Sequence, residues 1–184
     1  MRKIIVEAEV SLNGISDSPD FMGQVFNYHS RDVQDYLSEL LFLPDALLMG
    51  RKTYEFFAEF WSTQEGKDAE RINSLPKHVA SRTLKKPLKW NATLIEGDVV
   101  KEIEKLKQQS DGYLLQYGIG ELTHTMLSHD LVDELRLVVY PFTVGNGSHH
   151  FENMGLNLFK LLDARTFSSG AVALHYRPIG EESG

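Results

Sequence analysis

The sequence predicts an α/β protein, a three-layer α-β-α sandwich on a mixed, mainly parallel central sheet with a C-terminal antiparallel hairpin. Three observations lead to this fold class. Strand-like runs alternate with segments of helical periodicity, which is the pattern of parallel strands joined by helices. Residues 46–49 form a continuous apolar run, as in a strand buried on both faces. Near the C-terminus, two β-rich runs flank Ser168-Ser169-Gly170, as the strands of a hairpin flank their turn.

The first expected strand covers residues 2–10, which alternate with a period of two. Its two faces differ in polarity. One face carries only apolar residues, and the other carries three charged residues and one isoleucine: Ile4, Val6, Ala8 and Val10 against Lys3, Glu7, Glu9 and Ile5. Residues 16–20, which include Pro19, are expected to form a loop after this strand.

The later elements follow from periodicity and from the residues that start them. Helices are expected after Ser30, from Gly50 through residue 60, after Asp98 and after Gly120. The other strands are expected at residues 77–81, 92–95, 113–116, 135–140, 158–167 and 171–177. No repeat, low-complexity tract or linker interrupts this order. We therefore expect a single domain over residues 1–178 and a short tail at residues 179–184.

The composition is that of a globular protein and argues against several other classes. The 184 residues are 42% apolar and 24% charged, which is too apolar for a disordered chain. The net charge of -7 disfavours nucleic-acid binding, because attraction to phosphates supplies most of its non-specific affinity. There is no cysteine, and no apolar run approaches the ~20 residues that span a bilayer. The first residues do not resemble a signal peptide, so we expect a cytoplasmic protein without a membrane partner.

Three segments carry residue types that bind phosphate groups, and each follows an expected strand. In the first, Gly50, Arg51 and Thr53 open a helix directly after the buried strand. Free backbone N–H groups, a guanidinium and a hydroxyl would then lie at the carboxyl edge of the sheet, where an anion can bind. An ordinary strand-to-helix turn with a solvated arginine is the simpler interpretation of this segment when it is taken alone.

The other two segments have similar chemistry. In Ser81-Arg82-Thr83, two hydroxyls flank a guanidinium that can pair with a phosphate monoester, although a polar loop explains the tripeptide as well. Residues 118–120 place two glycines between a strand and a helix, which suits a pyrophosphate. The full GxGxxG pattern with its downstream acid is absent, so a standard Rossmann site is not predicted.

Together with three further motifs, these segments resemble the dihydrofolate-reductase-like family. The resemblance is to the branch of the C-terminal reductase domain of the bacterial riboflavin-biosynthesis deaminase/reductase. It covers nearly the whole chain through six motifs in order: SLNG at 11–14, GRKTYE at 50–55, SRTL at 81–84, the glycine turn at 118–120, LVDEL at 131–135 and PFTVGNG at 141–147. It implies an NADPH-dependent reductase that transfers hydride to a small pterin- or pyrimidine-like heterocycle.

The resemblance also implies which residues contact the cofactor. They are Gly50, Arg51 and Thr53 for the adenosine and pyrophosphate, Ser81, Arg82 and Thr83 for the 2′-phosphate, Gly118, Ile119, Gly120, Glu121 and Leu122 for the pyrophosphate, and Ser11, Asn13 and Gly14 for the nicotinamide pocket. The 2′-phosphate contacts favour NADPH over NADH. Two positions depart from the family pattern. Ile119 separates two glycines where the family has Gly-Gly or Gly-Ser, and Asn13 replaces the common aspartate.

The resemblance does not locate the catalytic acid. Dihydrofolate reductase carries a carboxylate on its first helix, and the corresponding helix here offers Asp32 and Asp35. Glu7 and Glu9 are alternatives, because acids on a central strand are costly unless they face a wet cleft or a partner. A merely solvated strand face is the simpler explanation of these two. We take Glu9 and Asp35 as the candidate catalytic acids.

Three further expectations concern the substrate, metals and partners. Trp61, with Phe56 and Phe57, is a candidate aromatic wall for a flat heterocycle, although aromatic residues at this spacing more often belong to the core. The seven histidines, including His149-His150, lack metal-ligand spacing, so no metal is expected.

A non-catalytic NADP-binding sensor or scaffold of the same fold is the alternative function. Self-association through residues 141–151 and the terminal hairpin is a third interpretation, and since relatives are often dimers, we expect a homodimer.

Overall fold

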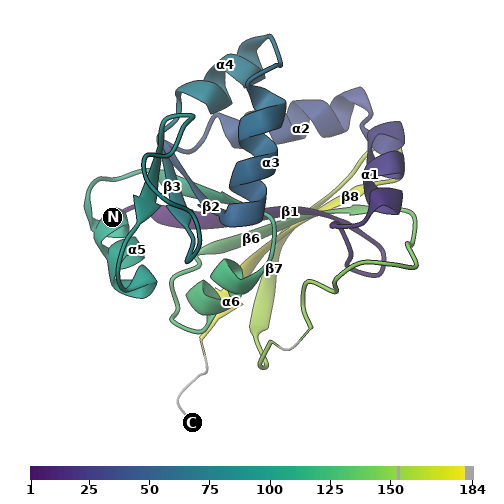
Figure 1. Ribbon diagram of the computed structural model, residues 1–184. Coiled ribbons are helices and arrows are strands. Elements are labelled where there is room, and N and C mark those ends of the chain that lie inside the picture. Colours follow the sequence, from purple (N-terminus) through teal and green to yellow (C-terminus); the bar gives the residue numbers. More distant parts are fainter. Residues whose placement is uncertain (153, 181–184) are drawn as a thin grey trace.

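The computed structural model describes residues 1–152 and 154–180, in which eight strands form one sheet in the order β4-β3-β2-β5-β1-β6-β8-β7 (Figure 1). The strands are β1 (Lys3–Ser11), β2 (Ala46–Gly50), β3 (Lys77–Ala80), β4 (Ala92–Ile95), β5 (Tyr113–Tyr117), β6 (Glu134–Tyr140), β7 (Leu158–Thr166) and β8 (Val172–Ile179). The helices are α1 (Pro19–Val25), α2 (Arg31–Leu41), α3 (Arg51–Trp61), α4 (Lys67–Ser74), α5 (Val99–Gln108) and α6 (Glu121–Leu127), with a 3₁₀ helix η1 (Phe26–Tyr28).

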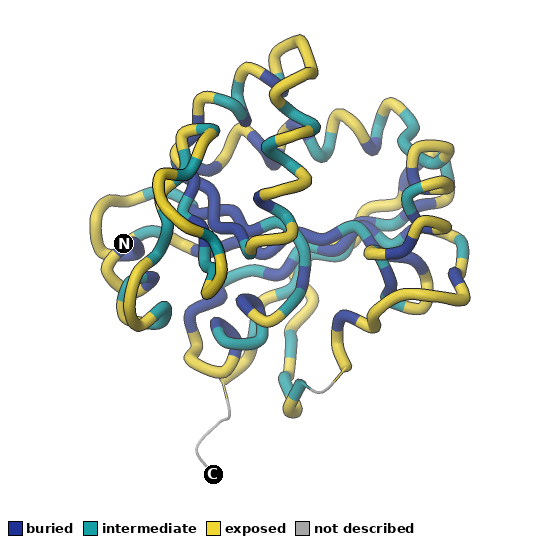
Figure 2. The backbone as a smooth tube through the Cα atoms, viewed as in Figure 1, coloured by how far each residue is buried: buried dark blue, intermediate teal, exposed yellow. Residues whose placement is uncertain are grey.

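The predicted fold class is confirmed. The first six strands run parallel to one another, with β1 between β5 and β6. The last two are antiparallel, since β8 pairs with β6 and β7 pairs with β8. Helices α1 to α4 cover one face of the sheet, and α5 and α6 cover the other (Figure 1). The parallel strands are buried between these layers, and the exposed residues lie mainly on the outer sides of helices and loops (Figure 2).

The two faces of β1 separate as its alternation predicts. Its apolar face packs in the core beside α5 and α6, against Ile103 and Met126, among others. Ile5 packs on the opposite face with Leu47 of β2 and Leu40 of α2. Glu7 and Glu9 therefore lie on the face that α1 to α4 cover, in the middle of the molecule.

Two helices differ from the sequence expectation. The loop expected at residues 16–20 is wrong, because α1 starts at Pro19 with the Ser18 side chain capping it by accepting a hydrogen bond from Phe21 N. Proline is favoured in the first turn of a helix, where its missing N–H costs nothing. Helix α4 has no counterpart among the expected elements, because only Ala69 and Ile72 in it are buried and two apolar residues give no visible periodicity.

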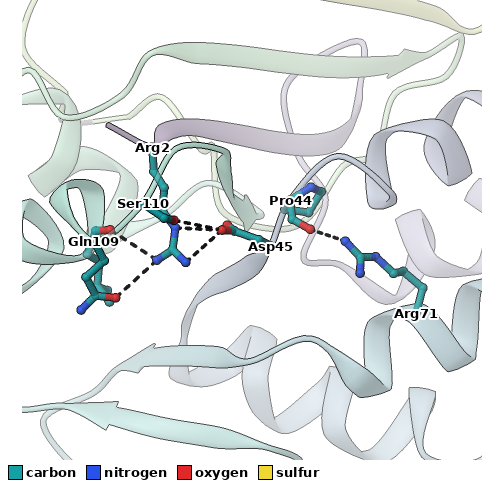
Figure 3. Close-up of polar contacts among 7 residues, drawn as sticks. Arg2, Pro44, Asp45, Arg71, Gln109 and Ser110 are labelled. Atoms are coloured by element: carbon teal, nitrogen blue, oxygen red, sulfur yellow. Dashed lines mark hydrogen bonds and ion pairs between the residues drawn. The ribbon is translucent and has the colours of Figure 1, made fainter.

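The amino-terminal edge of the sheet is closed by paired polar groups (Figure 3). Arg2 donates to Asp45 Oδ2 from Nε at 3.1 Å and from Nη2 at 2.9 Å, and Ser110 Oγ donates to the same oxygen at 3.3 Å. Arg71 donates to the carbonyl of Pro44, the residue that precedes Asp45. These bonds join the start of β1, the end of α5 and the entry to β2.

The last strand of the sheet ends near the C-terminus. Strand β8 runs through Ile179, one residue past the expected domain limit at 178, and residues 181–184 of the expected tail lie outside the described residues. In the described part of the chain, no helix has the length and apolar character needed to cross a membrane.

Candidate functional site

The three phosphate-binding segments converge at the carboxyl edge of the parallel strands. They follow β2, β3 and β5, which are neighbours in the sheet. A Cβ atom placed on Gly118 would lie 3.6 Å from Thr53 Oγ1, so the glycine turn and the start of α3 are in contact. The guanidinium of Arg82 pairs with the carboxylate of Glu121 at 2.8 Å. Three segments that are distant in the sequence therefore form one rim, which we call the carboxyl rim.

A fourth segment, Ser11 to Gly14, joins this rim through two histidines. His150 N donates to Gly14 O at 3.3 Å, and its ring bonds to the Ser16 hydroxyl. The ring of His124, in α6, bonds to His150 O at 2.9 Å. Burial lowers the pKa of His150, while a hydrogen bond with the Ile119 backbone acts in the opposite direction. His150 thus lies between the first loop and the glycine turn, a role that the sequence did not indicate.

Asn13 has a mainly structural part in the first loop. Its Nδ2 donates to Val144 O at 2.9 Å, and its Oδ1 accepts from Val144 N at 3.2 Å and from Ser11 Oγ at 2.9 Å. Ser11 is buried. These bonds tie the loop after β1 to the loop after β6, so Asn13 shapes the expected nicotinamide edge by fixing its backbone.

Hydrogen bonds to residues of β1 and β5 hold the glycine turn in place. Gly118 has a φ of +79°, which favours glycine, and its N–H donates to Glu7 O at 2.7 Å. Gln116 Nε2 donates to Gly118 O and to Thr123 Oγ1, both at 2.7 Å. Gln116 is buried and was not a sequence-predicted site residue. The turn is therefore rigid and is bonded directly to the strand that carries the two glutamates.

The rim residues fit the phosphate groups of a dinucleotide. Helix α3 begins at Gly50 without a side-chain cap, so the N–H groups of its first turn have no capping oxygen. A Cβ atom on Gly50 or on Gly120 would meet nothing within 4 Å, so the space above both is open. Ser81 Oγ accepts from the N–H groups of Thr83 and Leu84, which shapes the loop that presents Arg82. The Glu121 carboxylate is negatively charged and would repel an anion bound at the carboxyl rim.

Glu7 is the buried acid beneath this rim. Its side chain is only 3% exposed, and its Oε1 has no hydrogen-bond partner in the described part of the chain. Burial, with the charge of Glu9 adding to it, raises the pKa of Glu7 well above the value of an ordinary glutamate. The charge of Glu7 also contributes to the raised pKa values of Tyr117 and Tyr140, after burial as the main cause. The solvated-face explanation is thus wrong for Glu7.

Glu9 lies two residues further along the same face and is bonded on two sides. Its Oε2 accepts from the Tyr140 hydroxyl and is 2.7 Å from His29 Nε2. The side chain of Glu9 is 28% exposed and that of His29 is 18% exposed. Glu9 is therefore both fixed in position and accessible, and His29 and Tyr140 are site residues that the sequence did not reveal.

The two aspartates of the helix after Ser30 lie elsewhere. Asp35 has a side chain that is 59% exposed and lies 3.9 Å from Arg31 on the outer side of α2. Asp32 accepts from Ser168 N at 2.7 Å and from Ser168 Oγ at 2.9 Å, and hydrogen bonds from Ser30 and Ser168 lower its pKa to about 2. Among the described residues, no hydrogen bond or ion pair joins either aspartate to Glu9.

Comparison with known proteins places this geometry in a family. The family model of the RibD C-terminal domain matches residues 2–173. The chain belongs to this family. It is 29% identical over 181 residues to the uncharacterized protein YyaP of Bacillus subtilis, which covers 95% of this chain and 94% of that protein. The RibD C-terminal domain assignment confirms the family that the six motifs predict.

Two solved structures show the same fold. A candidate riboflavin biosynthesis protein of Shewanella sp. PV-4 aligns with a TM-score of 0.78 at 20% identity, over 96% of this chain and 99% of that one. Dihydrofolate reductase of Enterococcus faecalis, solved in complex with NADP(H), aligns with a TM-score of 0.65 at 11% identity, over 96% of both chains. At these identities the likeness establishes a dihydrofolate-reductase-like fold. The family supports the general class of oxidoreductase.

The aromatic residues of α3 lie at different positions along the helix. Trp61 is its last residue, about 15 Å along the axis from the carboxyl rim, and packs on the core that contains Leu47. Phe57 lies nearer to the acid face, with its ring centre 5.1 Å from that of Tyr117. Phe57 thus lies closer than Trp61 to Glu7, which Tyr117 faces across the β1–β5 pair. No three His, Asp or Glu side chains among residues 1–152 and 154–180 form a group that could hold a metal ion.

Proposed function

We propose that this RibD C-terminal domain protein is a reductase that binds NADPH along its carboxyl rim and transfers hydride to a small pterin- or pyrimidine-like heterocycle. The single observation that carries the proposal is the junction at Gly118. Its turn contacts the start of α3 on one side and bonds to Glu7 O of β1 on the other. A cofactor on the rim would therefore have its reactive end beside the acid face of β1.

The rim residues would hold the cofactor as the resemblance implies. The uncapped start of α3 suits the pyrophosphate, and the guanidinium of Arg82 suits the 2′-phosphate. The nicotinamide would supply the hydride, which is chemistry that protein side chains do not provide. The protein contributes position and the exclusion of water.

Glu9 is the proposed proton donor to the heterocycle. A ring that accepts hydride at carbon needs a proton on the neighbouring nitrogen, and an accessible carboxyl group can deliver it. Tyr140 and His29 hold the Glu9 carboxyl group in one place, and His29 is partly exposed and can return a proton from solvent. Asp35, which lies on the outer side of α2, has no part in this proposal.

Two measurements test the proposal in sequence. Titration of the purified protein with NADPH, followed by nicotinamide fluorescence, tests the rim. Loss of NADPH absorbance with a panel of dihydropterins and aminopyrimidines, offered with and without a ribose phosphate, tests the reductase activity. Tight NADPH binding with no turnover on any ring would instead support a non-catalytic NADP-binding sensor or scaffold.

Glu9→Gln tests the catalytic step separately from NADPH binding. The variant keeps the size of the side chain but replaces the carboxyl group with an amide that cannot act as an acid, so we expect kcat to fall while the Kd for NADPH stays the same. Glu96→Gln is the matched control, because Glu96 is an exposed acid that pairs with Lys86. An unchanged kcat in Glu9→Gln would remove Glu9 from the proposed chemistry.

A further inference from the structure

His150 is bonded to both loops that would enclose a dinucleotide on the carboxyl rim. Its backbone N–H donates to Gly14 O at 3.3 Å, and its ring Nε2 bonds to the Ser16 hydroxyl. The ring also forms a hydrogen bond with the backbone of Ile119, the middle residue of the glycine turn. His150 is only 9% exposed. A single buried imidazole therefore joins the expected nicotinamide edge to the expected pyrophosphate site.

Both bonds of this ring are compatible with a protonated imidazole. The bond with Ile119 favours the charged form of His150, so the ring N–H donates it to the Ile119 carbonyl. A neutral imidazole must then accept from Ser16 at its other nitrogen, whereas an imidazolium donates from both nitrogens. Because a hydroxyl can donate or accept, the bond with Ser16 persists in either charge state. The ring of His150 can therefore stay in place while its charge changes.

Burial is what keeps this imidazole neutral. It is the largest influence on His150 and lowers the pKa of the ring from its ordinary value of 6.5. Among the charged groups that act on the ring, Asp17 favours the protonated form, and His124 and His149 oppose it. Lys52, at the start of α3, lies near enough to act on Asp17. The charges that face His150 are thus of both signs, and one more negative group would favour protonation.

A dinucleotide on the carboxyl rim would bring such a group. Its pyrophosphate is anionic, and the site proposed for it is the turn to which the ring of His150 is bonded. A negative charge close to a histidine stabilises the imidazolium. By thermodynamic linkage, a ligand that favours protonation of the protein is itself bound more tightly when the proton is available.

We propose that His150 takes up a proton from solvent when a nicotinamide dinucleotide occupies the glycine turn. The imidazolium attracts the pyrophosphate through its charge, while its two N–H groups hold Ser16 of the first loop against Ile119 of the turn. His150 is thus a positioning residue, which couples cofactor binding to closure of the nicotinamide edge. The inference rests on the proposed function, because it needs a dinucleotide on the carboxyl rim.

Calorimetric titration in buffers of different ionisation enthalpy measures the proton uptake and needs no turnover. NADH is the first probe, because it has the pyrophosphate and lacks the 2′-phosphate, whose own proton titrates near about pH 6. At about pH 7 the wild-type protein should take up at least about half a proton per bound NADH. The affinity for NADH should also rise as the pH falls from about 8 to 6.5, by up to about tenfold per pH unit.

His150→Gln separates the charge of the ring from its hydrogen bonds. A glutamine amide can donate to Ile119 and accept from Ser16, but it does not gain a proton. We expect this variant to bind NADH about fivefold to tenfold more weakly at about pH 7, with no proton uptake and no dependence of the Kd on pH. His129→Gln is the matched control, because His129 is exposed and bonds to Thr125 O, and it should behave like the wild type.

Each outcome separates this inference from the proposed function. Wild-type protein that binds NADH and NADPH without proton uptake would overturn the inference and leave the proposed function standing. Proton uptake that persists in His150→Gln would also overturn it, since the proton would then belong to another group, such as His124. Failure of both dinucleotides to bind would overturn the inference and the proposed function together. Circular dichroism spectra would show whether His150→Gln is folded, and the wild-type titrations decide the matter without it.

Discussion

The two ends of the parallel strands are made from different kinds of residue. At the amino edge, Arg2, Asp45 and Ser110 satisfy one another with hydrogen bonds. At the carboxyl edge, glycines leave open space and helix α3 begins without a side-chain cap. The first arrangement stabilises the fold through Asp45 Oδ2, although Asp45 Oδ1 has no hydrogen-bond partner in the described part of the chain, whereas the second leaves backbone donors free. Substitutions at the two ends should therefore separate stability from binding.

The largest expected effect is at the glycine turn. In Gly118→Val, a branched side chain is forced into a φ of +79° and toward Thr53, which displaces the turn from the rim. We expect NADPH and NADH to bind at least about a hundredfold more weakly, while the protein stays folded. Fluorescence titration measures the binding. Gly23→Ala, in α1 where a Cβ atom meets nothing within 4 Å, is the control and should bind normally.

The amino edge should show the reverse behaviour. Arg2→Ala removes the guanidinium whose Nε and Nη2 both donate to Asp45 Oδ2, and we expect the free energy of unfolding to fall by about 2 kcal/mol, the value of a hydrogen bond to a charged group. Denaturant unfolding measures the loss. NADPH affinity should not change, and a parallel loss of binding would show that the two ends are not independent.

Glu7, in the middle of β1, should govern how stability depends on pH. Burial raises its pKa above the ordinary value of 4.5, so the folded protein keeps this proton over a range in which the unfolded chain releases it. The stabilisation is complete below about pH 4.5 and is lost as pH rises toward the raised pKa. Glu7→Gln should remove a downward slope of up to about 1.4 kcal/mol per pH unit. Thermal unfolding at a series of pH values checks it, and identical slopes in both proteins would contradict it.

Arg82 should distinguish the two nicotinamide cofactors. Arg82→Ala loses a bidentate partner for the 2′-phosphate, so NADPH should bind about tenfold more weakly, with a much smaller change for NADH. The ratio of the two dissociation constants is the quantity to measure. Equal losses for both cofactors would remove the 2′-phosphate assignment.

The smallest expected effect concerns Glu121. Its carboxylate pairs with Arg82 and would lie close to a 2′-phosphate bound there. Glu121→Gln should therefore strengthen NADPH binding by about threefold at low salt and less at high salt, with NADH unaffected. Glu55→Gln frees Arg51 in the same way and should leave the ratio of NADPH to NADH affinity unchanged. Weaker NADH binding in Glu121→Gln would instead show that Glu121 contacts the ribose.

The sequence predicted those parts of the fold that have strong periodicity. The two faces of β1, the strand expected at residues 46–49 and the Asp98 cap of α5 all follow from the local sequence, and each is present, with β2 reaching one residue further to Gly50. Helices α1 and α4 were missed because they are short and bury few side chains. The Ser18-Pro19 start of α1 was a readable signal that the surrounding turn residues obscured.

The candidate site, too, was predictable from the sequence only in part. The carboxyl rim could be anticipated because the ends of parallel strands meet at one edge. The neighbours of Glu9 could not, since His29 and Tyr140 reach it only through tertiary packing. His150 and Gln116 likewise act through contacts that no local pattern encodes. The sequence showed Glu7 and Glu9 as unusual acids on a central strand, but it did not show which residues surround them.

The hydrogen bonds between Asp32 and Ser168 connect the acid face to the hairpin. Asp32 lies in the first turn of α2, three residues after His29, and Ser168 lies in the turn between β7 and β8. An event that shifts the turn thus shifts the segment that presents His29 to Glu9. Thermodynamic linkage makes such an effect reciprocal, so occupancy of the site beside Glu9 would in turn alter the conformational equilibrium of the hairpin turn.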